Sequence, residues 1–192
     1  GYIATAVCHE IRLPLAPSLR MDYALADRRV QFRMASENPD KLPLIRSLLA
    51  RHRGDSVLVI GQYLDQLNLL SEELGVPLIT GETPQGKRDE LYAAFREGRL
   101  PVLVVSKVAN FAIDLPDARV AIQVSGTFGS RQEEAQRLGR ILRPKSDGGP
   151  ASFYTLVTRD TSEQEFAQHR QLFLTEQGYA YTILDAANVN AS

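Results

Sequence analysis

Short apolar runs alternate with segments of helical periodicity along most of the chain. Continuous apolar runs at 57–60, 76–80, 101–106, 120–125 and 152–158 predict buried strands, and a final strand is expected at 179–184. Between them, apolar residues recur every three or four positions and predict helices over 64–74, 89–99, 131–142 and 161–177. Strands that are apolar along their whole length are typical of a parallel sheet covered on both faces. The pattern therefore predicts a doubly wound α/β fold.

The first fifty residues are less regular, because prolines at positions 14, 17, 39 and 43 interrupt them. A strand over 3–13 and a helix over 40–52 are compatible with the pattern. We expect a lead-in segment over 1–45, a core domain over 46–185 and a short tail over 186–192. The chain starts at Gly1 without a methionine, which we interpret as the boundary of a segment cut from a longer protein.

Composition narrows the functional classes. The 192 residues are 44% apolar and 23% charged, as in a soluble globular protein, and no apolar run has the length of a membrane span. The net charge of −1 argues against coating nucleic acid by bulk positive charge but permits a local basic site. The lone Cys8 can form no internal disulfide, and three scattered histidines lack metal-ligand spacing, so we expect no metal site.

Residues 81–88 nearly match the phosphate-binding loop of nucleotide-binding proteins. The match fails at the last position, where Arg88 replaces the hydroxyl residue that holds magnesium. Pro84 also removes a backbone donor, and Glu82 adds a negative charge where phosphates would lie. We therefore interpret the segment as a polar turn, with Lys87 and Arg88 facing solvent or a nucleic-acid backbone. A nucleotide site that uses Lys87 remains an alternative.

The helix predicted over 131–142 carries the strongest chemical signal. Its start has a capping box from Ser130 to Glu133. Spacings of four and three residues place Gln136, Arg140 and Arg143 on one face. The opposite face is apolar and comprises Ala135, Leu138, Ile141 and Leu142.

The positive charge of this helix is suited to binding phosphate. Five basic and two acidic residues give residues 131–145 a local charge of +3. Two guanidinium groups one turn apart can grip a γ-phosphate and stabilise the charge that develops on it, as arginine fingers do. Pro144 disfavours helical geometry at Arg143, so the last arginine is expected where the helix ends. An ordinary solvated basic face is the alternative reading of the spacing.

A family resemblance favours the first interpretation. The run Gln136-Arg137-Leu138-Gly139-Arg140-Ile141-Leu142-Arg143 resembles motif VI of superfamily-two helicases. The wider stretch 129–143 specifically resembles the xeroderma pigmentosum group B (XPB) family. Residues 81–88 resemble the motif IVa region, residues 106–118 resemble motif V, and residues 153–179 resemble the C-terminal end of that family. The resemblance covers nearly the whole chain and implies a RecA-like fold for the core domain, with a lead-in from a first motor domain.

The resemblance assigns roles residue by residue. It implies that Arg140 and Arg143 are arginine fingers, and that Gln136 lies close to the γ-phosphate and the attacking water. Arg137 and Asp114 would belong to the nucleotide site, with Asp114 on the ribose or coupling that site to DNA. Five further residues would contact phosphates of the tracked strand: Gln62, Thr83, Arg88, Ser106 and Lys107.

We therefore expect the second motor domain of an ATP-dependent 3′–5′ DNA helicase or translocase. ATP and Mg²⁺ would be shared with a first motor domain outside this chain, and the chain alone would be inactive because the phosphate loop and the DExH box are missing from it. The expected partners are DNA, that first motor domain and repair or transcription proteins, with no membrane, in the cytoplasm or nucleoid of a prokaryote or the nucleus of a eukaryote. A non-catalytic RecA-like module that binds DNA or protein is the alternative.

Overall fold

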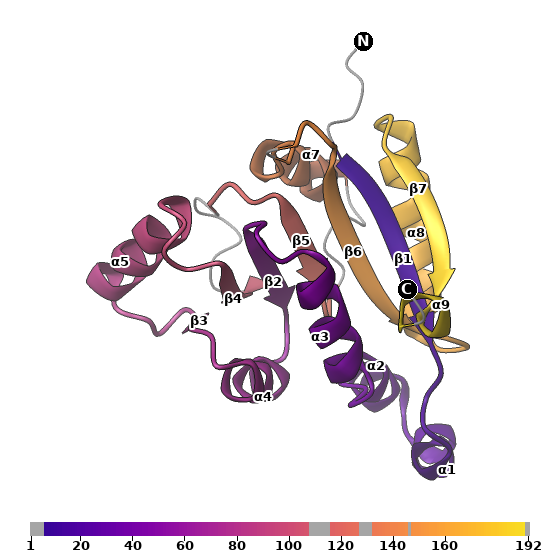
Figure 1. Cartoon of the computed structure of the whole chain (residues 1–192). Helices are drawn as coiled ribbons and strands as arrows, with labels where there is room; N and C mark the ends of the chain where they lie inside the picture. The colour runs from indigo at the N-terminus through magenta and orange to yellow at the C-terminus, as the bar shows by residue number, and fades with distance from the viewer. Residues whose placement is uncertain (1–5, 108–115, 127–131, 146, 191–192) are drawn as a thin grey trace.

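The computed structural model describes residues 6–107, 116–126, 132–145 and 147–190 of the chain. The elements, in chain order, are β1 (Ala6–Leu13), α1 (Pro17–Leu25), α2 (Arg28–Ser36), α3 (Lys41–Arg51), β2 (Val57–Gly61), α4 (Leu64–Leu74), β3 (Leu78–Ile79), α5 (Gln85–Arg96), β4 (Val102–Ser106), β5 (Val120–Gln123), α7 (Gln132–Ile141), β6 (Ala151–Thr158), α8 (Ser162–Glu176), β7 (Ala180–Asp185) and α9 (Ala186–Asn190). Figure 1 shows their arrangement.

The seven strands form one sheet in the order β3-β4-β2-β5-β6-β1-β7, and every neighbouring pair is parallel. Alternate residues of each strand enter two apolar clusters, one on each face. The first cluster joins the sheet to α5, α7 and α8. The second joins it to α3, α4 and α9. Helices therefore cover both faces, which confirms the predicted fold class.

The first strand is an integral part of this sheet. β1 lies between β6 and β7, with Ala6 beside Ala151 and Val7 beside Ala180. Leu44 and Ile45 of α3 are fully buried in the second cluster. The expected boundary at residue 45 therefore does not separate a lead-in from a core, because residues on both sides of it share one sheet and one core.

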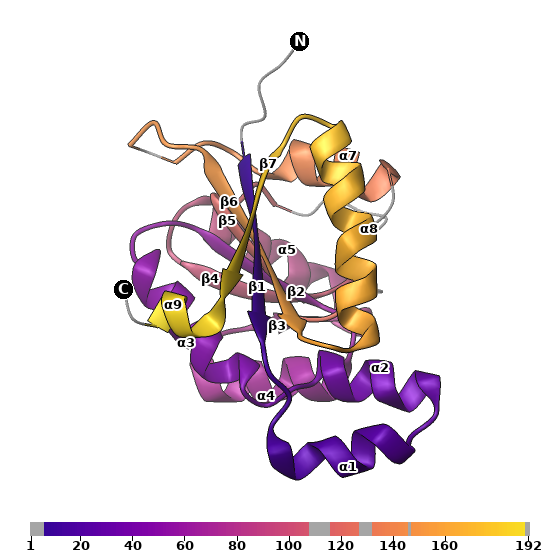
Figure 2. The ribbon, with the colours of Figure 1, turned by 90° about the vertical axis from the view of Figure 1, so that its right-hand side faces the viewer.

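The prolines that suggested a linker instead mark where elements begin or end. Pro14 directly follows β1, and Pro17 is the first residue of α1, where a missing N–H costs nothing. Pro43 lies in the first turn of α3 for the same reason. Figure 2 shows α1 and α2 beyond the carboxyl end of β1, at one pole of the molecule.

A second difference concerns the strand predicted over 76–80, of which only Leu78–Ile79 is a strand. Val76 instead takes part in the hydrogen bonds that end α4. Its N–H donates to Ser71 O at 3.1 Å, and its carbonyl accepts from the Ser71 hydroxyl. Gly75 makes this turn possible with a φ of 66°, in the left-handed region.

A buried ion pair joins α2, α3, β5 and α8 near the carboxyl ends of the strands. The Lys41 ammonium donates to Glu163 Oε2 at 2.8 Å and to the carbonyls of Ser36 and Val124. The other Glu163 oxygen accepts from Thr158 N–H at 2.7 Å. All three donor sites of the ammonium are thus used, as a buried charge requires. The network fixes the chain where it leaves β5 and where α8 begins.

Candidate functional site

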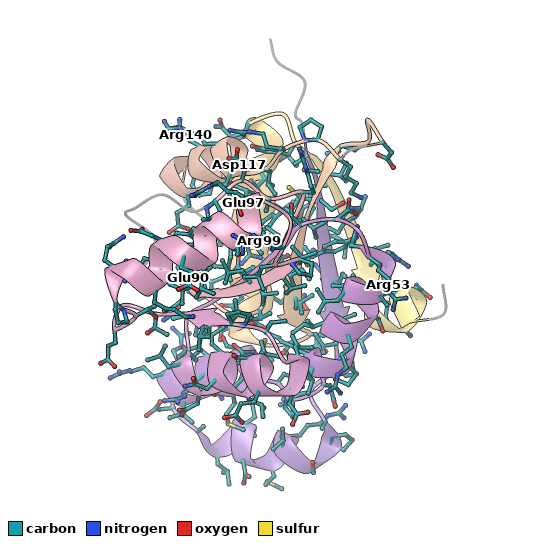
Figure 3. All side chains as sticks on the ribbon, turned by 60° about the vertical axis from the view of Figure 1, so that its left-hand side comes forward. Arg53, Glu90, Glu97, Arg99, Asp117 and Arg140 are labelled. Atoms are coloured by element: carbon teal, nitrogen blue, oxygen red, sulfur yellow. The ribbon has the colours of Figure 1, made fainter. Side chains whose placement is uncertain are left out.

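Helix α7 presents the predicted polar face to solvent. Gln136 and Arg140 are exposed, whereas Leu138 and Ile141 are buried against the sheet. The helix ends at Ile141, so Arg143 lies just beyond it, as the following proline predicts. In Figure 3, Arg140 lies at the same end of the molecule as Asp117 and extends into solvent.

The end of α7 is fastened to the residues that precede β5. Ala118 N–H donates to Ile141 O, and Arg143 N–H donates to Ala118 O, both at 2.9 Å. The Arg143 guanidinium lies 3.4 Å from Asp117 Oδ1, and that of Arg119 donates to Pro144 O. The Arg143 side chain is still 44% exposed. Its guanidinium is therefore both held in place and open to an incoming anion.

Several predicted positions lie outside the described parts of the chain. Asp114 is one of them, and the side chain of Arg137 is another. The expected capping box from Ser130 to Glu133 and the side chain of Ala135 also lie outside the described parts of the chain.

Three predicted DNA-contact residues meet where β2, β4 and β5 end. Gln62 follows β2, and its N–H donates to the Ser125 hydroxyl at 2.8 Å. Lys107 follows β4, and a β-carbon added at Gly126 would lie 3.6 Å from the Lys107 side chain and 3.1 Å from Gln62 Oε1. Ser106 belongs to the same group but is 3% exposed. We call Gln62, Ser106, Lys107, Ser125 and Gly126 the carboxyl-edge cluster.

Lys107 is paired with a carboxylate of α7. Its Nζ lies 3.4 Å from Glu134 Oε1, and the two side chains are 13% and 8% exposed. The pair links the carboxyl-edge cluster to the helix that carries Arg140.

The turn at 81–88 differs from its predicted form at Arg88. The expectation that Arg88 faces solvent or a nucleic-acid backbone is wrong, because the side chain is 9% exposed and donates to the carbonyls of Thr80 and Thr83. Thr83 is partly exposed, and its hydroxyl accepts from Thr80 N–H at 2.9 Å. Lys87 is exposed as expected. The spacing of Arg88 to the buried Tyr92, one turn later, could have indicated its orientation.

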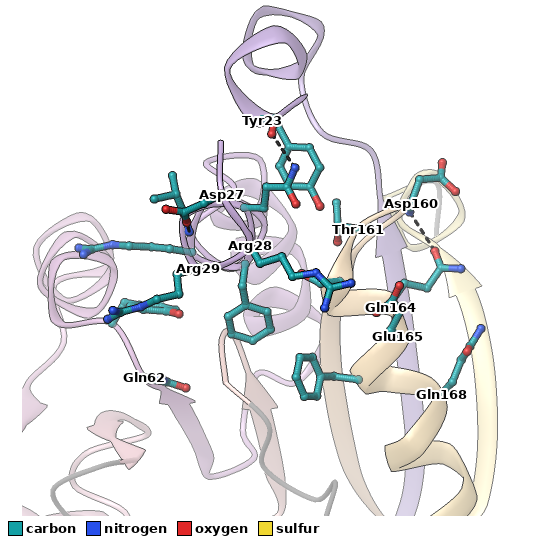
Figure 4. A pocket seen from close by; sticks show the side chains of 17 residues that line it. Tyr23, Asp27, Arg28, Arg29, Gln62, Asp160, Thr161, Gln164, Glu165 and Gln168 are labelled. Atoms are coloured by element: carbon teal, nitrogen blue, oxygen red, sulfur yellow. Dashed lines mark hydrogen bonds between the residues drawn. The ribbon is translucent and has the colours of Figure 1, made fainter. Parts of the chain in front are cut away.

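A groove of about 1040 Å³ lies between α2 and α8 and was not predicted from the sequence. The rings of Phe32 and Phe166 meet edge to face across it at 5.2 Å, and Arg33 lies over the Tyr63 ring. Figure 4 shows Arg28 extending from α2 toward α8. The four-residue spacings in α2, from Arg28 to Phe32 and from Arg29 to Arg33, were a signal for this face.

The described residues form neither a metal-binding cluster nor a membrane-spanning helix. They contain no group of three or more histidine, cysteine, aspartate or glutamate side chains placed to hold a metal ion. Among them there is also no helix with the length and apolarity needed to cross a membrane.

Comparison with known proteins decides the family. A family model described as the ERCC3/RAD25/XPB C-terminal helicase matches residues 1–192. The chain belongs to this family. It is 56% identical over 190 residues to a protein of Kineococcus radiotolerans named DNA 3′-5′ helicase XPB, and 57% identical over 186 residues to one of the same name from Mycobacterium tuberculosis. These matches cover 99% and 97% of this chain but 34% of each relative, so the chain spans about a third of their length.

A more distant relative supports the same family, and solved structures support the fold. The chain is 36% identical over 190 residues to the Saccharomyces cerevisiae general transcription and DNA repair factor IIH helicase/translocase subunit XPB/SSL2, covering 96% of this chain and 22% of the relative. The C-terminal domain of the DEAD-box protein Dbp5 superposes with a TM-score of 0.64 at 15% identity, with 98% of each chain covered. T4 UvsW gives 0.67 at 12% identity, over 96% of this chain and 42% of that chain. These likenesses confirm the RecA-like helicase fold.

Proposed function

We propose that this chain is the second motor domain of an ATP-dependent 3′–5′ DNA helicase or translocase of the XPB type. The observation that carries the proposal is α7, which displays Gln136 and Arg140 in solvent and is followed directly by the half-exposed side chain of Arg143. Family membership supports it, since the bacterial relatives bear the name DNA 3′-5′ helicase.

The arginines fit the triphosphate of ATP bound between two motor domains. Arg140 lies in the last turn of α7 and Arg143 just beyond it, and backbone bonds to Ala118 fix that end. Preorganised guanidinium groups stabilise charge on the γ-phosphate without a reorganisation cost. Gln136 on the same face would orient water, while Arg137 and Asp114 would complete the nucleotide contacts. When ATP is bound, its Mg²⁺ neutralises phosphate charge, and the first motor domain would supply the residues that hold the ion.

The carboxyl-edge cluster, together with Thr83 of the 81–88 turn, would contact the backbone of the tracked DNA strand. Gln62, Thr83 and Lys107 are partly exposed and carry donors that suit phosphate oxygens. Ser106 and Arg88 are buried, so their role in this surface would be to support the loops. Such contacts position a strand without reading its sequence, which agrees with a chain of net charge −1.

The working context of the full-length protein would be DNA repair, transcription or both. The yeast relative is named as a subunit of a transcription and DNA repair factor, which supports proteins of those processes as partners. The protein would then act where its DNA lies, in the nucleoid of a prokaryote or the nucleus of a eukaryote. We expect this chain alone to hydrolyse no ATP, because the arginines are one half of a shared site.

Substitution of Arg140 in the full-length protein tests the proposal. Arg140→Ala is expected to abolish ATP hydrolysis while leaving the affinity for single-stranded DNA nearly unchanged, because Arg140 is not one of the proposed DNA-contact residues. Arg99→Ala is the matched control, since Arg99 is an exposed arginine that pairs with Glu97 on the surface. A parallel loss of DNA binding and hydrolysis would indicate a basic DNA-binding face instead.

A further inference from the structure

Two ion pairs tie α7 to both ends of one crossover. The crossover from β4 to β5 starts at Lys107 and ends near Asp117. Lys107 pairs with Glu134 in the first half of α7, and Asp117 pairs with Arg143 just beyond its last residue. The helix therefore spans the sheet from the carboxyl end of β4 to the amino end of β5.

The two pairs differ in burial. The Arg143 and Asp117 side chains are 44% and 58% exposed, so solvent screens their attraction. Lys107 and Glu134 are 13% and 8% exposed. Separating a buried pair is costly unless another charge replaces the lost partner. Lys107 can leave Glu134 readily only when a different anion reaches its ammonium group.

The surroundings of Lys107 indicate what that anion would be. Its side chain packs beside Gly126, which Gln62 also approaches, in the cluster that the proposed function assigns to DNA phosphates. A phosphate placed there would compete with the Glu134 carboxylate for one ammonium group. Glu134 and Arg140 belong to one helix and lie about 9 Å apart along its axis, so a change at Glu134 reaches Arg140 through a rigid element.

We propose that Glu134 is a positioning residue that couples DNA at the carboxyl edge to the arginines of α7. This inference rests on the proposed function. Without DNA, the Lys107–Glu134 pair holds α7 in one position. A DNA phosphate takes over Lys107, this restraint on Glu134 ends, and α7 pivots about the end that Ala118 fixes, which brings Arg140 onto the γ-phosphate beside Arg143.

The test is Glu134→Gln in the full-length protein, with ATP hydrolysis measured with and without a single-stranded oligonucleotide. Glutamine keeps the shape and a hydrogen bond but removes the competing charge. We expect the basal rate to rise and the ratio of stimulated to basal rate to fall about fivefold or more. The concentration of oligonucleotide that gives half-maximal stimulation should fall, because Lys107 is released to the phosphate. Lys107→Arg keeps a cation beside Glu134 and should preserve most of the ratio.

Two further variants separate the possible outcomes. Glu73→Gln removes an exposed carboxylate that pairs with Arg46 on the surface, and it should leave both rates unchanged. Arg140→Ala tests the proposed function separately. If the proposed function is wrong, ATP hydrolysis survives in this variant. A folded Glu134→Gln protein that keeps the wild-type ratio, or loses basal and stimulated rates in equal proportion, overturns the coupling role.

Discussion

The hydroxyl of Tyr179 lies where a side chain on Gly139 would stand, with 2.5 Å between its oxygen and the position of an added β-carbon. Gly139 is in the interior of α7, where glycine lowers helix stability by about 1 kcal/mol relative to alanine. The close approach explains why a glycine is used there. It sets how closely the arginine-bearing helix packs on the start of β7.

Gly139→Ala should displace α7 and lower ATP hydrolysis by the full-length protein about tenfold or more, since misplacement by about 1 Å can cost a hundredfold. Tyr179→Phe should rescue most of this loss in the double variant, because the next ring atom lies 3.8 Å from the added β-carbon, which is ordinary contact distance. Steady-state rates of the two single variants and the double variant measure the effect. Additive losses in the double variant would show that the hydroxyl is not the obstacle.

The Lys41–Glu163 pair should be a major determinant of stability. Lys41→Met leaves the Glu163 carboxylate buried without its cation, which costs about 3–5 kcal/mol in comparable sites. Glu163→Gln in the same background should recover part of this cost, since a neutral amide oxygen can still accept from Thr158 N–H. Urea unfolding of the wild type, the two single variants and the double variant gives the coupling free energy. A coupling free energy near zero would contradict a stabilising interaction between Lys41 and Glu163.

Acid should destabilise the domain partly through His9. Burial and the positive charges of His52, Lys145 and Arg51 lower the pKa of His9 from 6.5 to about 4. The unfolded chain therefore binds this proton more tightly than the folded one, and the stability present above pH 6.5 is lost as the pH falls toward 4.

His9→Gln should therefore flatten the dependence of Tm on pH between 6.5 and 4. The overall Tm also falls in this variant, because the His9 ring stacks on Tyr154 at 4.9 Å. The exposed His169 supplies the control variant, His169→Gln, whose curve should keep the wild-type slope. Equal slopes for the His9 variant and the wild type would show that His9 does not contribute to the loss of stability in acid.

The sequence predicts the sheet and α7 well because both have strong local signals. Continuous apolar strands identify a parallel sheet, and the four- and three-residue spacings of α7 correctly separate the exposed Arg140 from the buried Leu138. The place of β1 between β6 and β7 was not predictable, because strand pairing over such separations leaves no local pattern. The prolines were misleading because a proline at a helix start and a proline in a linker look alike in sequence.

The site was predicted less completely than the fold. Charged residues near loops were expected to face solvent, yet Arg88 is buried and bonds to backbone carbonyls, and Lys107 is paired with Glu134. Both arrangements depend on which elements meet in space. The groove between α2 and α8 was missed for the same reason, since its two walls are more than a hundred residues apart in the chain.

The position of β1 sets an order of events during synthesis. Among the strands of this sheet β1 leaves the ribosome first, but its two partners, β6 and β7, are made last. Until then the apolar residues of β1, such as Ile11 and Leu13, have no neighbouring strands to bury them. The nascent chain must therefore keep an unpaired strand from aggregating, and any premature stop before Ala151 leaves a product that chaperones and proteases would recognise as incomplete.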